Sequence, residues 1–138
     1  MQLSKREFLA AGLGCLAAPR VFAQGFPSKT ITIIVPFAPG GTTDVLARIV
    51  GQELSMRLGT AVVENKTGGA GVVGWNSVAK GPTDGHTLLT TELSLAIAAS
   101  LNPNMPFDPR KDLTQIITAA SVPHVLVVNP KVPAATLQ

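Results

Sequence analysis

Short runs of β-branched residues alternate with helical segments from residue 30 to residue 101, and this order limits the folds open to the chain. Residues 30–35, Thr-Ile-Thr-Ile-Ile-Val, lie between Lys29 and Pro36 and predict a buried strand. Strands that alternate with helices predict an α/β fold with a mostly parallel sheet covered on both faces. The predicted strands are 30–35, 61–64, 86–91, 113–119 and 125–129, and the predicted helices are 42–58, 72–80 and 93–101.

Charge and composition narrow the class of protein. The 138 residues are 46% hydrophobic with a mean hydropathy of +0.34, which excludes a disordered polar chain and supports one domain. The net charge of +3 is concentrated in the first 23 residues, and the remainder carries eight basic and seven acidic side chains. With only 4% aromatic residues and no basic cluster, the chain is not expected to bind nucleic acid.

Residues 1–23 have the pattern of a cleavable secretory signal. Lys5 and Arg6 precede an apolar run of 11 residues, 8–18, which is too short to span a bilayer. Small residues at Val21 and Ala23 predict cleavage after Ala23, and therefore a periplasmic location. Residues 4–9 also resemble a twin-arginine export motif, so both the Sec and the twin-arginine routes stay open. Cleavage before Cys15, the single cysteine, would instead indicate a lipoprotein.

The loop after the first strand is the strongest candidate for a binding site. Pro36-Phe37-Ala38-Pro39-Gly40-Gly41 follows the carboxyl end of that strand and leads directly into a helix, which Thr42 or Thr43 is expected to cap. Free N–H groups and the helix dipole favour an anion there, and ligands of parallel α/β sheets bind at this edge. No lysine follows the glycines, so a carboxylate is favoured over a phosphate. The alternative is that the loop is only a tight connection between the strand and the helix, in which Asp44 offsets the helix dipole.

A second glycine motif leaves two classes of function open. Residues 69–74, Gly-Ala-Gly-Val-Val-Gly, match G-x-G-x-x-G, and Glu92 lies 18 residues beyond the last glycine, as in a Rossmann-type nucleotide-binding enzyme. However, residues 64–68 separate the motif from the preceding strand. A second main-chain anion site, or close packing of helix on sheet, is the alternative.

Catalytic and metal sites are not predicted. His86 and His124 lack partners at helical spacing, and no nucleophile–base pair or close acid pair is visible. His86 is therefore expected to be structural, and Trp75 is expected to pack in the core or at a domain edge. Thr91 and Ser94 carry hydroxyls that either bind a polar ligand or cap a helix.

Several segments resemble the Bug (TctC-like) substrate-binding proteins of tripartite tricarboxylate transporters. The resemblance covers residues 24–138 and is most specific in the first strand, loop and helix. The segments that carry it are residues 33–48, 63–66, 68–74, 84–89, 106–113 and 123–128.

This resemblance implies an α/β periplasmic-binding-protein lobe of the type II-like kind, in a monomer that needs no cofactor or metal. It implies a signal peptide at 1–23, a first lobe at 24–122, and a crossover with the start of a truncated second lobe at 123–138. The implied function is to capture a small carboxylate for membrane permease subunits. A non-binding remnant of a longer protein is a further alternative. The implied ligand-binding residues are Phe37, Ala38, Gly40, Gly41, Thr42, Asp44, Gly68, Gly69, Thr91 and Ser94.

Overall fold

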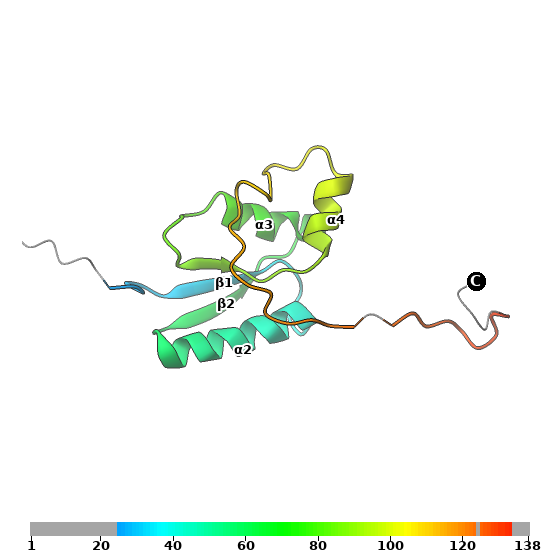
Figure 1. Cartoon of the computed structure of the whole chain (residues 1–138), viewed down its shortest axis with the longest axis horizontal. Helices are drawn as coiled ribbons and strands as arrows, with labels where there is room; N and C mark the ends of the chain where they lie inside the picture. Colours follow the sequence, from blue (N-terminus) through cyan, green and yellow to red (C-terminus); the bar gives the residue numbers. More distant parts are fainter. Residues whose placement is uncertain (1–24, 124, 134–138) are drawn as a thin grey trace, which may run out of the picture.

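A three-stranded parallel sheet with helices on both faces forms the body of the molecule (Figure 1). The structure is a computed structural model that describes residues 25–123 and 125–133. The predicted signal peptide and cleavage site therefore lie outside the described residues. The elements in chain order are β1 (Ile31–Val35), α2 (Thr42–Arg57), β2 (Ala61–Asn65), the short 3-10 helix η2 (Gly69–Gly71), α3 (Val72–Ala79), β3 (Thr87–Leu89) and α4 (Ser94–Leu101).

The strand order is β2-β1-β3, so the first strand of the chain is the central one. Both pairings are parallel, with Ile31 opposite Ala61 in one ladder and Thr32 opposite Thr87 in the other. The α/β prediction is confirmed, and the ends of these strands and helices differ from the predicted ones by a few residues at most. Because the strands are parallel, the loops that follow them all emerge at the same edge of the sheet.

The burial of β1 explains its continuous apolar sequence. Helix α2 packs on β1 and β2, whereas α3 packs on β1 and β3 on the other side of the sheet (Figure 1). Ile33, Val35 and Ala47 form the buried core cluster between β1 and α2. Gly51 brings α2 close to the sheet, since a Cβ atom there would lie 3.4 Å from Cδ1 of Ile33. A strand covered on both faces needs apolar residues at successive positions.

The strands predicted at 113–119 and 125–129 are wrong. The structure assigns neither segment to a strand, and apolar side chains such as Ile117 and Val127 are 77% and 80% exposed. An apolar β-branched run forms a strand only where another strand offers it a hydrogen-bonding edge. In the described residues neither segment has such a partner. Nowhere in the described residues does a helix combine the length and the apolar character needed to cross a membrane.

Candidate functional site

Three loops meet at the carboxyl edge of the sheet. We name them loop 1 (residues 36–41, after β1), loop 2 (66–71, after β2) and loop 3 (90–93, after β3). Loop 2 begins with the N–H of Lys66 donating to the carbonyl of Val35 at 2.9 Å, and loop 3 begins with the N–H of Thr90 donating to the carbonyl of Ile34 at 2.9 Å. Both loops therefore start beside the end of the central strand, where a ligand site is expected in this fold.

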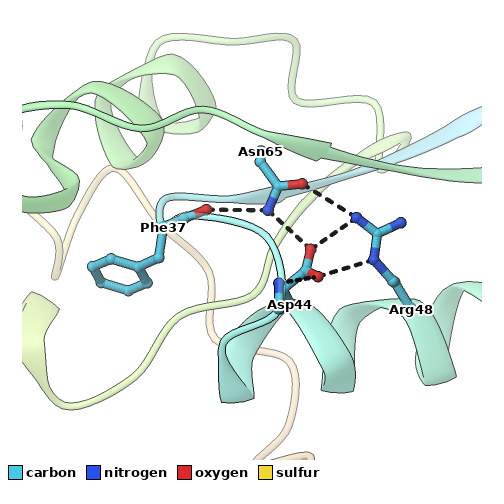
Figure 2. A network of polar contacts seen from close by, with 5 residues as sticks. Phe37, Asp44, Arg48 and Asn65 are labelled. Atoms are coloured by element: carbon cyan, nitrogen blue, oxygen red, sulfur yellow. Dashed lines mark hydrogen bonds and ion pairs between the residues drawn. The ribbon is translucent and has the colours of Figure 1, made fainter.

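Loop 1 is held by a polar network centred on Asp44 (Figure 2). One carboxylate oxygen of Asp44 accepts the N–H of Gly40 at 2.9 Å and Nε of Arg48 at 3.0 Å. The other oxygen accepts Nη2 of Arg48 at 3.0 Å and Nδ2 of Asn65 at 2.9 Å. The same Nδ2 donates to the carbonyl of Phe37 at 3.1 Å. The network thus fixes loop 1 to the first turns of α2 and to the end of β2.

The network also fixes the charge of Asp44. Hydrogen bonds from Arg48, then from the N–H of Gly40 and from Asn65, hold the pKa of the Asp44 carboxyl well below its usual range. The side chain is only 3% exposed and is fully occupied by these donors. Asp44 is therefore an anion that organises loop 1, and it has no proton to give to a ligand near neutral pH.

The first turn of α2 retains unused donors. The helix is capped at Gly41 with no side-chain cap bond, so the prediction that Thr42 or Thr43 caps it is wrong. Thr43 is instead buried, and the Asp44 carboxylate takes the N–H of Gly40. Among the described residues the N–H groups of Gly41 and Thr42 have no partner, and both residues are exposed. These two amides are available to an anion, whereas that of Gly40 is engaged.

Loop 2 has an unusual backbone. Residues 68–71 all have positive φ, at +133°, +54°, +54° and +105°, and Ala70 is the non-glycine among them. The carbonyl of Gly68 accepts the N–H groups of Gly71 and Val73, which closes the loop on itself. A Cβ atom at Gly74 would lie 2.7 Å from the carbonyl oxygen of Lys66 and 2.8 Å from Cα of Pro36. That contact explains the last glycine of the G-x-G-x-x-G pattern by close packing of α3 on loops 1 and 2.

Loop 3 is connected to the other loops through Trp75 on α3. The indole N–H donates to Oγ1 of Thr91 at 2.8 Å, and the ring meets that of Phe37 edge-on with centroids 6.3 Å apart. Ser94 is the first residue of α4, and its Oγ is buried without a hydrogen-bond partner in the described residues. Phe37 and Thr91 thus share a buried neighbour.

All ten residues predicted for binding lie at this one edge, in loop 1, the start of α2, loop 2, loop 3 and the start of α4. The prediction did not include Arg48, Asn65 or the link from Trp75 to Thr91. The i,i+4 spacing of Asp44 and Arg48 was a usable signal, because such pairs meet on one helix face. The partners of Asn65 and Trp75 lie far along the chain, and no local pattern names them.

His86 lies at the opposite edge of the sheet and is structural, as expected. Its Nε2 accepts the N–H of Ser28 at 3.1 Å, and its Nδ1 lies 3.0 Å from the carbonyl of Asp84. Lys29 and the N–H of His86 lower the pKa of Asp84 to about 2. The described ranges contain no group of three His, Cys, Asp or Glu side chains arranged to hold a metal ion.

Comparison with known proteins places the chain in a family. Residues 46–138 match the family model described as the tripartite tricarboxylate transporter family receptor, TctC. The chain belongs to the TctC family. It is 44% identical to BugT of Bordetella pertussis over 119 residues. This alignment covers 84% of the chain and 36% of BugT. The 138 residues span between a third and two fifths of the length of such TctC relatives.

Solved structures support the fold. The periplasmic binding protein BugD matches with a TM-score of 0.60 at 36% identity, over 63% of this chain and 29% of BugD. MatC from Rhodopseudomonas palustris, solved with bound malate, matches with a TM-score of 0.60 at 39% identity, over 63% of this chain and 30% of MatC. A third neighbour, from R. palustris with adipate, has a TM-score of 0.58 at 35% identity and covers 62% of this chain and 29% of its own. The predicted periplasmic-binding-protein fold is confirmed, and the family is one of solute-binding proteins.

Proposed function

We propose that this protein supplies one side of the binding site of a periplasmic receptor that captures a small carboxylate for a tripartite transporter. The observation that carries the proposal is that the N–H groups of Gly41 and Thr42, two exposed residues, have no partner among the described residues and lie at the edge where all three loops meet. Two solved relatives hold malate and adipate, both small dicarboxylates. Membrane permease subunits are the proposed downstream partner, and residues 24–122 are proposed to form the first lobe.

The proposed contact is electrostatic and made by the main chain. A carboxylate oxygen accepts the first-turn amides of α2, where the helix dipole adds about 0.3–1 kcal/mol. Each charge-assisted hydrogen bond adds about 1.5–3 kcal/mol. Gly68 and Gly69 in loop 2 and the hydroxyls of loop 3 are proposed to add further contacts. Asp44 is proposed to keep loop 1 in shape without touching the ligand.

Removal of one amide tests the proposal. Gly41 has φ −76°, which suits proline, and a Cβ atom there would lie 3.7 Å from the carbonyl oxygen of Ala38, an ordinary contact. Gly41→Pro therefore deletes the N–H at a compatible φ of Gly41, and Gly41→Ala keeps it as the matched control. We expect malate affinity, measured by NMR titration, to fall about 10- to 100-fold in Gly41→Pro and far less in Gly41→Ala. Equal affinities in the two folded variants would contradict the proposal.

The competing classes of function are tested in the same titration. Binding of a dinucleotide in place of malate or adipate would support the Rossmann-type alternative. A folded chain that binds none of these compounds at tens of millimolar would support a non-binding remnant.

A further inference from the structure

Trp75 contacts all three loops although it belongs to none of them. It is fully buried on α3, with 0% of its surface exposed. Its ring packs edge-on against Phe37 of loop 1, and its Nε1 donates to Thr91 of loop 3. In loop 2, a Cβ atom at Gly71 would lie 2.7 Å from Cζ2 of the indole, so the ring lies directly against that glycine. One rigid side chain therefore sets the spacing of the loops.

The hydrogen bond to Thr91 also sets the direction of a hydroxyl. An indole N–H only donates, and a threonine hydroxyl has one proton and two acceptor lone pairs. Because Oγ1 of Thr91 accepts from Trp75 at 2.8 Å, its own proton cannot be used in that bond. Among the described residues the Thr91 side chain has no second partner, and Thr91 is half-buried. The hydroxyl proton remains for an acceptor outside this pair.

We propose that Trp75 is a positioning residue that makes the Thr91 hydroxyl a hydrogen-bond donor to the bound carboxylate. The inference rests on the proposed function and names one of its side-chain contacts. An anionic oxygen accepts this proton. The indole engages one of the two lone pairs of Oγ1, so the hydroxyl keeps its full donor capacity but only half of its acceptor capacity. Trp75 thereby favours acceptor-rich ligands without touching them.

The chain provides a direct probe, because Trp75 is its single tryptophan. The 138-residue chain labelled with ¹⁵N has one indole N–H cross-peak, which reports this hydrogen bond. We expect the cross-peak to exchange slowly with solvent and to shift when malate is added. Thr91→Val, which removes the hydroxyl at nearly constant shape, is expected to move the cross-peak in the free protein and to weaken malate binding about 10- to 100-fold.

Thr91→Ser is the matched control, since it keeps the hydroxyl. It is expected to retain the indole cross-peak position, its response to malate, and an affinity within about threefold of the unchanged chain. Trp75→Phe keeps an aromatic ring and deletes the N–H. Where this variant folds, we expect it to weaken malate binding, and to make Thr91→Val less costly in the double variant than in the unchanged background.

The outcomes separate the inference from the proposed function. If the unchanged chain binds malate and Thr91→Val binds it equally well, the inference is overturned while the proposed function stands. The same holds if folded Trp75→Phe binds as tightly as the unchanged chain. If the folded, unchanged chain binds neither malate nor adipate, the proposed function fails and the ligand contact of Thr91 fails with it. If Trp75→Phe does not fold, the comparison of Thr91→Val with Thr91→Ser and the response of the indole cross-peak to malate still test the inference.

Discussion

At the scale of single residues, Asp44 is a buried carboxylate that organises loop 1, where we propose that an anion binds. It accepts four hydrogen bonds from Gly40, Arg48 and Asn65, and its side chain is almost completely buried. The negative charge is balanced locally by the guanidinium of Arg48. The amides of Gly41 and Thr42 belong to the same turn, and within the described part of the chain neither has a hydrogen-bond partner.

The first prediction concerns Asp44→Asn and pH. The pKa of Asp44 lies far below its usual 3.8 in the folded state, so the unfolded chain binds more protons in acid. The contribution of Asp44 to stability is therefore complete above about pH 5 and is lost as the pH falls toward the folded pKa. We expect urea denaturation to show a smaller loss of stability between pH 5 and pH 3 in Asp44→Asn than in the unchanged chain. Parallel pH profiles would contradict this assignment.

The same variant tests the role of Asp44 in binding. Since the carboxylate organises loop 1 and is not placed against the ligand, folded Asp44→Asn is expected to keep most of its malate affinity at pH 7. Complete loss of binding by a protein with an unchanged circular dichroism spectrum would show that Asp44 contacts the ligand.

A second residue-scale prediction concerns Gly74. A Cβ atom there would meet main-chain atoms of Lys66 and Pro36 at 2.7–2.8 Å, and main-chain atoms cannot rotate away. Gly74→Ala is therefore expected to lower the free energy of unfolding by about 1–3 kcal/mol, measured by denaturant titration. Gly25→Ala is the control, because nothing lies within 4 Å of its added Cβ. A neutral Gly74→Ala would show that α3 shifts freely on the loops.

At the scale of elements, Asn65 joins the end of β2 to loop 1 and to α2. Its Nδ2 donates to Phe37 and to Asp44, and its Oδ1 accepts from Arg48 at 3.3 Å. The amide of Asn65 therefore donates and accepts hydrogen bonds, and its partners lie more than 15 residues away in the chain.

The prediction for Asn65→Asp follows from the loss of these donors. The new carboxylate cannot donate to Phe37 and lies against the charge of Asp44, so we expect the variant to be less stable by about 2–4 kcal/mol at pH 7. Asn102→Asp is the matched control, because Asn102 is exposed and its side chain makes one hydrogen bond to the described residues, in which Oδ1 accepts the N–H of Asn104. Thermal unfolding of both variants measures the difference. Equal midpoints would show that the link between β2 and loop 1 carries little energy.

The elements also show what the sequence could predict. The β-branched run of β1, the helices and the position of loop 1 follow from local periodicity and from proline and glycine. The contacts of Asn65 and Trp75 depend on which strands become neighbours, and that is decided by the whole sheet. The run at 125–129 was predicted as a strand because it is apolar, yet a strand also requires a partner edge that local sequence cannot supply.

At the scale of the whole molecule, the proposed binding edge is formed by loops 1 to 3 and by the starts of α2 and α4. In the described residues the amides of Gly41 and Thr42 have no partner there, and part of α4 and the segments around residues 116 and 126 leave large apolar side chains exposed. A ligand held on one side retains much of its contact with water, so each hydrogen bond to it is weaker than in a closed site.

We therefore expect the 138-residue chain to bind malate with a dissociation constant near a millimolar, at least about tenfold weaker than MatC under the same conditions. Isothermal titration calorimetry on both proteins measures the ratio. Equal affinities would show that the three loops alone supply the binding energy.

Because the strands β2, β1 and β3 are parallel, the proposed site lies at one end of the sheet and the connecting turns lie at the other. Every loop of the proposed site leaves the carboxyl ends of the strands, whereas the turns at 58–60 and 80–86 enter their amino ends. A dye, an affinity handle or a surface tether attached near Gly59 would sit on the far side of the sheet. If the molecule is immobilised through that turn, the loops of the proposed site point away from the surface, which is the orientation that a biosensor requires.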